Sequence, residues 1–197
     1  MPMDAARFFM LRHEPLHGMM TDRLLAELTD AQLRARPQDQ NSIAWLLWHV
    51  ARAEDIGVNA FAYDRSQVFD DGGWAKRIGS ERRDLGTSMT SDEVTAFSER
   101  ADVGALRAYW RAVGDRTLDT VRREGARRWE DAVDPARMRR IIREDGDYGP
   151  RVDANRVETF YAGMTRAWAF AHLALSHSFT HFGEAGVVRG MLGFPGV

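Results

Sequence analysis

Four long stretches of the chain carry apolar residues at the spacing of a helix, and this pattern limits the fold more than any other feature. They cover about residues 4–28, 41–61, 91–124 and 155–190. None of them shows the strict alternation of apolar and polar residues that is typical of a half-buried strand. Long polar connections separate them at residues 64–90 and 125–152. The sequence therefore predicts an all-α fold, a four-helix bundle with long connections.

Two places in this pattern leave alternatives open. Pro15 lies inside the first helical stretch, where a proline costs about 3 kcal/mol. Either the helix kinks there, or a new helix begins with Pro15 in its first turn. The segment RMRRIIR, residues 137–143, fits a strand as well as a helical turn.

Composition excludes several classes of function. The 197 residues suit one domain over 1–197, and they include no cysteine, so any thiol chemistry needs a cosubstrate. The net charge of −2 gives no general attraction to nucleic acid or to an anionic membrane. We expect no membrane span, because no apolar run reaches 18 residues. The first residues lack a secretory signal pattern, so a cytoplasmic protein is expected.

Two pairs of histidines have the four-residue spacing that places side chains on one helix face. The sequence HEPLH, residues 13–17, matches the H-E-x-x-H pattern of zinc proteases. Pro15 interrupts it and no companion motif follows, so we interpret His13 and His17 as partly exposed side chains. The second pair, His177 and His181, has no helix breaker between its members. It suits either a metal site or a seam between packed helices.

His49 strengthens the metal interpretation of the second pair. It lies within the apolar stretch AWLLWHVARAED, where a buried polar group without a partner is costly. A third imidazole that faces His177 and His181 would complete a three-histidine site. Three neutral nitrogens with an open fourth position are typical of catalytic zinc sites.

Two stretches together resemble a known family. NSIAWLLWHVARAED, followed far downstream by HSFTHFGEAGVVRGMLG, is similar to the DinB-like (YfiT-like) metalloenzymes, which are four-helix bundles. The resemblance covers nearly the whole chain. It implies a divalent metal ion, zinc or nickel foremost and iron as an alternative, held by His49, His177 and His181. It also implies homodimers, and some relatives are thiol-dependent transferases.

The resulting hypothesis is a metal-dependent transferase or hydrolase, in which a low-molecular-weight thiol or water attacks a small-molecule substrate. We expect no nucleic-acid or membrane partner. Glu54 and Glu184 are candidates to orient the ligand histidines, although each also fits a solvated helix charge. Two alternatives remain: a non-catalytic metal- or ligand-binding bundle of the stress-response kind, and a purely structural bundle.

Other residues receive a structural interpretation. His172 lies five residues before His177, so in an α-helix it points away from the face of the pair. Trp45 and Trp48 are expected in the core. A run of arginines is expected to be a solvated loop face, paired with Glu144 and Asp145. Its members are Arg137, Arg139, Arg140 and Arg143.

Overall fold

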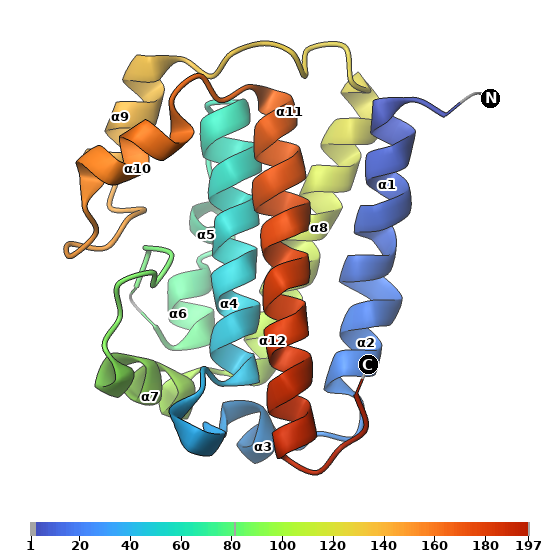
Figure 1. Cartoon of the computed structure of the whole chain (residues 1–197), viewed down its shortest axis with the longest axis vertical. Helices are drawn as coiled ribbons and strands as arrows, with labels where there is room; N and C mark the ends of the chain where they lie inside the picture. Colours follow the sequence, from blue (N-terminus) through green and yellow to red (C-terminus); the bar gives the residue numbers. More distant parts are fainter. Residues whose placement is uncertain (1–2, 81, 197) are drawn as a thin grey trace.

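Four long helical columns form the body of the molecule in the computed structural model, which describes residues 3–80 and 82–196 (Figure 1). The first joins α1 (Ala5–Pro15), η1 (Leu16–Met20) and α2 (Thr21–Leu25), and the second joins α4 (Ile43–Glu54) and η3 (Asp55–Ala62). The third is α8 (Val103–Glu124). The fourth joins α11 (Arg166–Ala169), η4 (Phe170–Ser176) and α12 (His177–Met191). The predicted four-helix bundle is confirmed.

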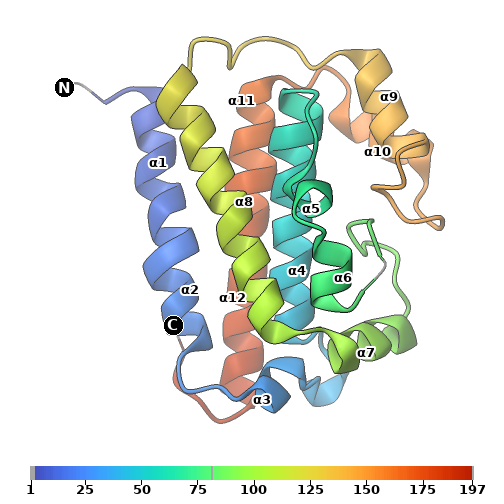
Figure 2. The same cartoon turned by 180° about the vertical axis from the view of Figure 1, so that it is seen from behind.

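The second column is the centre of the bundle, because α4 packs against both α8 and α12 (Figures 1 and 2). The Ser42 hydroxyl caps this helix by accepting from the Trp45 backbone N–H at 3.0 Å. Every residue from Ile43 to Glu54 is buried. A helix that is apolar on most sides needs neighbours on most sides, and α4 has them. α1 packs on α8 and α2 on α12, which closes the bundle.

The third and fourth predicted stretches each divide into separate helices, and the break in the third lies at the irregularity that the sequence indicates near residues 102–104. The stretch 91–124 divides into α7 (Ser91–Arg100) and α8, with Asp102 capping the second helix through the Ala105 N–H at 2.7 Å. The fourth bundle helix begins at Arg166 rather than near residue 155. A separate helix, α10 (Ala154–Tyr161), precedes it. The two are separated by Gly163, whose φ of 73° ends helical geometry, and by the N-cap Thr165.

The long connections contain short helices instead of open loop. Residues 64–90 include α5 (Val68–Asp71) and α6 (Trp74–Ile78), which lie beside α4 and α8 (Figure 2). The ambiguous segment 137–143 belongs to α9 (Pro135–Arg143), which Asp134 caps. Near the start of the chain are α3 (Asp30–Arg34) and the 3₁₀ turn η2 (Pro37–Asp39). Among the described residues β-structure is limited to one isolated bridge, Ala132 with Thr165.

Three of the bundle columns contain π-helical segments, namely η1, η3 and η4. Pro15 ends α1, and the column continues through η1 with a kink at Gly18 (φ −104°, ψ −106°), so the kinked alternative is the observed one. In a π turn, hydrogen bonds join residues five apart and side-chain positions rotate relative to an α-helix. No helix in the described residues has both the length and the apolarity needed to cross a bilayer.

Candidate metal site

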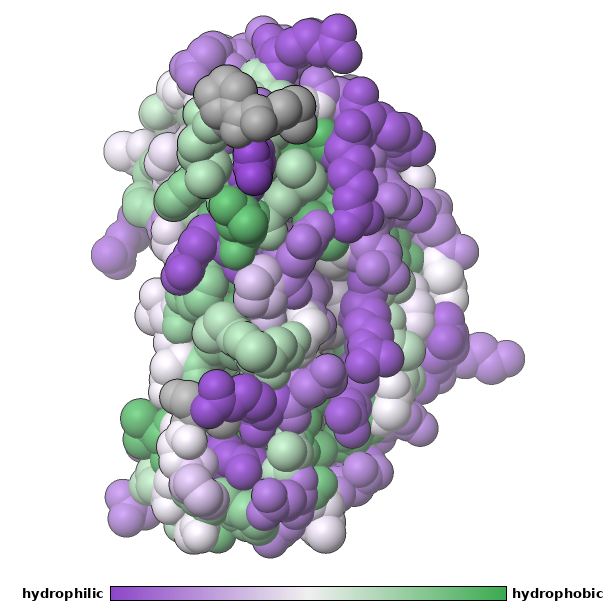
Figure 3. Space-filling view, turned by 90° about the vertical axis from the view of Figure 1, so that its right-hand side faces the viewer, coloured by the Kyte–Doolittle hydropathy of each residue, from purple (hydrophilic) through white to green (hydrophobic). Residues whose placement is uncertain are grey.

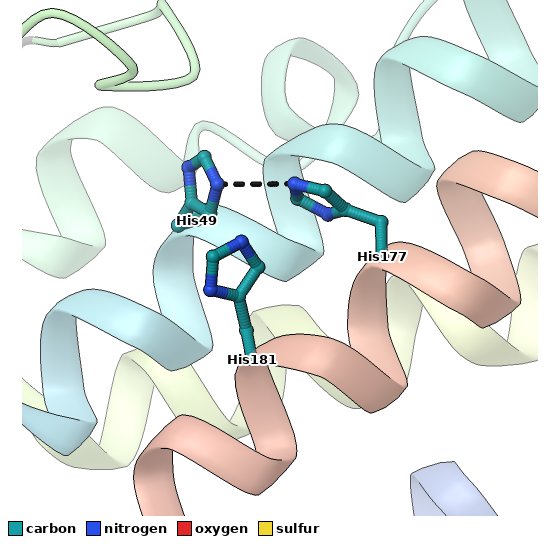
Figure 4. A group of neighbouring side chains, drawn as sticks. All are labelled: His49, His177 and His181. Carbon is teal, nitrogen blue, oxygen red and sulfur yellow. Dashed lines mark hydrogen bonds between the residues drawn. The ribbon is translucent and has the colours of Figure 1, made fainter.

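The structure brings His49, His177 and His181 together from α4 and α12 (Figure 4). One ring nitrogen of each lies within 4.8 Å of the other two. The Nε2 atoms of His49 and His177 are 3.2 Å apart, and the ring of His181 meets that of His49 at an angle of 89°. The three rings face a common space, as the sequence pattern predicted. Groups of this kind can hold a metal ion.

Hydrogen bonds on the outer sides of two rings set their tautomers. Nδ1 of His49 lies 2.6 Å from the Leu85 carbonyl, which only accepts, so this nitrogen carries the proton. Nδ1 of His181 lies 2.8 Å from Glu184 Oε2 and donates to it in the same way. Each Nε2 is then left with a lone pair, and both point into the shared space (Figure 4). This is the arrangement that orients histidine ligands in metal sites.

Burial keeps the imidazoles of His49 and His177 neutral. It lowers the pKa of His49 to about 4, with a further contribution from His181. Burial, followed by the repulsion of His49 and His181, lowers the pKa of His177 to about 2. Because a metal ion binds the neutral imidazole, both rings have the protonation state that ligation requires at neutral pH.

The long connection at residues 64–90 supplies the carbonyl that holds His49. The backbone there makes a tight turn at Gly86, which has φ of 78°. A Cβ at this position would lie 2.6 Å from the Trp48 ring, so only glycine lets this segment of the connection approach α4 so closely. Leu85 is further held by its N–H bond to the Asp147 carbonyl at 3.0 Å. A turn 36 residues from His49 in sequence thereby positions the ring.

Of the two glutamates predicted to orient ligand histidines, Glu184 does contact one of them and Glu54 does not. Glu184 contacts His181 as described, and its other oxygen accepts from the Asn41 amide at 3.0 Å. Glu54 is fully buried and contacts His13 and His17 instead of His49, so both interpretations offered for it were wrong. The sequence contained a signal for this outcome. A glutamate on a helix buried on all sides requires polar partners elsewhere in the chain.

The HEPLH segment forms no protease site. Its Glu14 is exposed and pairs with Arg122 at 2.8 Å, away from the histidines. The expectation of partly exposed histidines was also wrong, because His13 is completely buried and His17 is 8% exposed. The π-helical continuation beyond Pro15 keeps the two rings stacked, with centroids 4.3 Å apart.

A cavity of about 570 Å³ adjoins the three-histidine cluster and is lined by His177 and His172. The prediction that His172 points away from the pair was wrong. It lies in η4, and the wider π turn brings a residue five positions before His177 to the same side. Their ring centroids are 6.5 Å apart. The volume is in the range of small-molecule sites.

The other side chains singled out from the sequence have structural contacts. Trp45 and Trp48 are buried as expected, and Trp45 stacks on His49 with centroids 4.8 Å apart. In the arginine run, Arg140 pairs with Asp145 at 3.2 Å and with Asp64 at 2.8 Å. These exposed pairs agree with a solvated face.

Fold and site define an all-α bundle with a histidine cluster able to hold a metal ion. The chain belongs to the DinB superfamily, whose family model matches residues 16–185. A solved structure of a conserved protein from Enterococcus faecalis is similar, with 16% identity over 98% of this chain and 99% of that chain, and a TM-score of 0.71. At this identity the likeness shows the fold alone. A comparison with curated proteins found no match.

Proposed function

We propose that His49, His177 and His181 hold a divalent metal ion, zinc or nickel foremost, and that the protein is a metal-dependent transferase or hydrolase. One observation carries the proposal. Hydrogen bonds to Leu85 and Glu184 leave the Nε2 atoms of His49 and His181 free to accept, and one ring nitrogen of each of the three histidines lies within 4.8 Å of the other two. The ring of His177 faces the same space, with its Nε2 3.2 Å from that of His49, so a cation placed there could take up all three rings as ligands.

The residues around the cluster have defined parts in this function. The Leu85 carbonyl holds the ring of His49, and the Glu184 carboxylate holds the ring of His181. Burial lowers the pKa of His49, so protons do not compete with a metal ion for its Nε2 at neutral pH. Trp45 covers one face of His49. A metal ion bound here would act as a Lewis acid, lowering the pKa of a thiol or water that occupies its open position.

The adjoining cavity is the proposed substrate site. His177 lies in its wall, so a molecule bound there contacts a ligand of the proposed ion. Apolar side chains, among them Phe160 and Leu173, line the cavity together with Arg151 and Arg156. This combination suits a small molecule with an apolar body and an anionic group. The chain has no cysteine, so a sulfur nucleophile would come from a low-molecular-weight thiol.

Metal removal tests the catalytic part of this proposal. Protein prepared without a histidine tag is stripped with a chelator, reloaded with Zn²⁺ or Ni²⁺, and assayed for thiol consumption with an activated aryl halide, an epoxide and an ester. At neutral pH only a few per cent of a free thiol is thiolate, whereas a coordinated thiol is deprotonated. We therefore expect the loaded protein to consume thiol roughly 10- to 30-fold faster than the stripped protein.

The same assay also distinguishes an enzyme from a non-catalytic metal-binding bundle and from a purely structural bundle. Stoichiometric metal with no acceleration for any electrophile, by thiol or by water, would refute the enzyme and leave a metal-binding bundle. Absence of bound metal after reloading would refute both and leave a structural bundle.

We also propose a homodimer, as the family resemblance implies. The outer face of α1 and η1 exposes Phe8, Leu11 and Met19, each more than half accessible. Figure 3 shows apolar side chains gathered along this side of the molecule, next to a band of hydrophilic ones. Exposed apolar patches on soluble proteins are typical of protein interfaces.

Sedimentation equilibrium checks the dimer. We expect about twice the mass of the chain, and a monomer for Leu11→Glu, because a charge in the interface is desolvated without a partner. Arg111→Glu, on the exposed side of α8, is the control and should remain dimeric. A monomeric unmodified protein would contradict the proposal.

A further inference from the structure

A second group of ligating side chains lies between α1, η1 and α4. Nε2 of His13 is 2.7 Å from Glu54 Oε1, and Nε2 of His17 is 2.8 Å from Oε2. One ligating atom of each residue lies within 4.8 Å of the other two. Two imidazoles with one carboxylate are a donor set that binds zinc in metalloenzymes. We propose that His13, His17 and Glu54 form a second, buried site for a divalent cation.

The buried carboxylate at this position requires a compensating positive charge. His13 and Glu54 are fully buried, and a buried carboxylate is costly unless a positive charge compensates it. The partners that contact it are two imidazoles. Their centroids lie 4.3 Å apart, so a proton on one opposes a proton on the other. A divalent ion with both imidazoles neutral would supply that positive charge, and the cluster would then carry a net charge of +1.

Stacked aromatic rings hold the two imidazoles in place. Phe9, His13, His17 and Trp110 form a continuous stack, with successive centroids 4.9, 4.3 and 3.5 Å apart. Gly114 on α8 makes room for this stack, because a Cβ there would lie 2.2 Å from His17 Nδ1. A site whose ligands are already locked by packing loses little entropy on binding.

The π-helical segments give an independent indication. Within residues 3–80 and 82–196, η1 contains His17, η3 begins directly after Glu54, and η4 ends directly before His177. All three therefore border the two histidine clusters. π turns are rare and are frequent at functional sites. The Thr21 hydroxyl, at the start of α2, donates to the carbonyl of Leu16 in η1 at 2.6 Å and gives that carbonyl a hydrogen-bond partner.

The chemistry of the site indicates a structural ion. Both carboxylate oxygens face a histidine nitrogen, so bidentate binding by Glu54 would give four donor atoms in a closed site. Nitrogen and oxygen ligands together suit zinc, cobalt and nickel better than calcium or magnesium. Such an ion would tie the first bundle column to the central helix α4.

Zinc titration of tag-free protein tests the proposal. The protein is unfolded with chelator, refolded with Zn²⁺ alone and analysed for bound metal and for Tm. We expect two equivalents in the unmodified protein, and one in the double variant His177→Ala/His181→Ala. Zn²⁺ should still raise the Tm of that double variant. Adding Glu54→Gln to it should remove the remaining equivalent and the Tm shift.

Glu14→Gln is the matched control, because this glutamate lies beside His13 but points to solvent. It should bind two equivalents. If Glu54→Gln fails to fold, as far-UV circular dichroism would show, His13→Asn replaces it. A double variant that binds no Zn²⁺ and has an unchanged Tm would overturn the proposal and leave a hydrogen-bonded cluster. Metal lost only on Glu54→Gln would uphold it and refute the three-histidine site instead.

Discussion

His177→Ala is expected to remove the metal ion from the three-histidine cluster and abolish metal-dependent thiol consumption. Loss of a group that merely orients a ligand costs about 10- to 100-fold in metal affinity, and this substitution removes the ligand itself. We therefore expect affinity to fall by more than about 100-fold, measured by competition with a chelating dye. His177 also lines the cavity, so its loss affects substrate and metal together.

His172→Ala is the control for this substitution. It removes the same side chain from the same cavity wall, five residues earlier, without removing a proposed ligand. It should leave metal affinity unchanged. Glu184→Ala should give an intermediate loss, because His181 keeps its position in the chain but loses the acceptor of its Nδ1 proton. Equal metal content in His177→Ala and the unmodified protein would contradict the assignment.

Arg52→Ala is expected to produce the largest loss of stability. The guanidinium is fully buried on α4 and donates to Gln67 at 2.7 Å, to Tyr109 at 3.1 Å and to Asp147 at 3.2 Å. It also lies 3.5 Å from Asp55. Its removal leaves buried Asp55 without a cation, and leaves buried Asp147 with Arg83 alone, at 3.2 Å. Breaking a buried ion pair in this way costs about 3–5 kcal/mol in the free energy of unfolding, which urea denaturation measures.

An exposed ion pair provides the comparison. Arg111 and Asp22 lie 3.4 Å apart with side chains 67% and 59% exposed, so Arg111→Ala should cost about 0–1 kcal/mol. The difference between the two variants isolates the effect of burial. A loss below about 1 kcal/mol for Arg52→Ala would show that water or a rearranged side chain replaces the guanidinium.

Helical periodicity predicted the bundle, and histidine spacing together with the family resemblance predicted the convergence of His49, His177 and His181. The apolar stretch around His49 indicated the same convergence, because a polar side chain buried there needs a polar partner. The position of Glu184, three residues after His181, also follows from α-helical geometry.

The predictions failed where helical geometry departs from 3.6 residues per turn. His172 was placed with α-helical angles, but η4 follows a wider turn. His13 and His17 were interpreted as partly exposed because Pro15 lies between them, but the helical column continues past Pro15 into η1 and buries both. Glu54 was missed for a different reason. Its partners lie 41 and 37 residues away in sequence, and no local pattern connects them.

The central helix α4 contributes His49 to one cluster and Glu54 to the other, five positions apart. A slide of this helix along its axis would disturb both groups of ligands at once. Occupancy of either group would therefore oppose the slide and favour occupancy of the other, with the same coupling free energy in both directions.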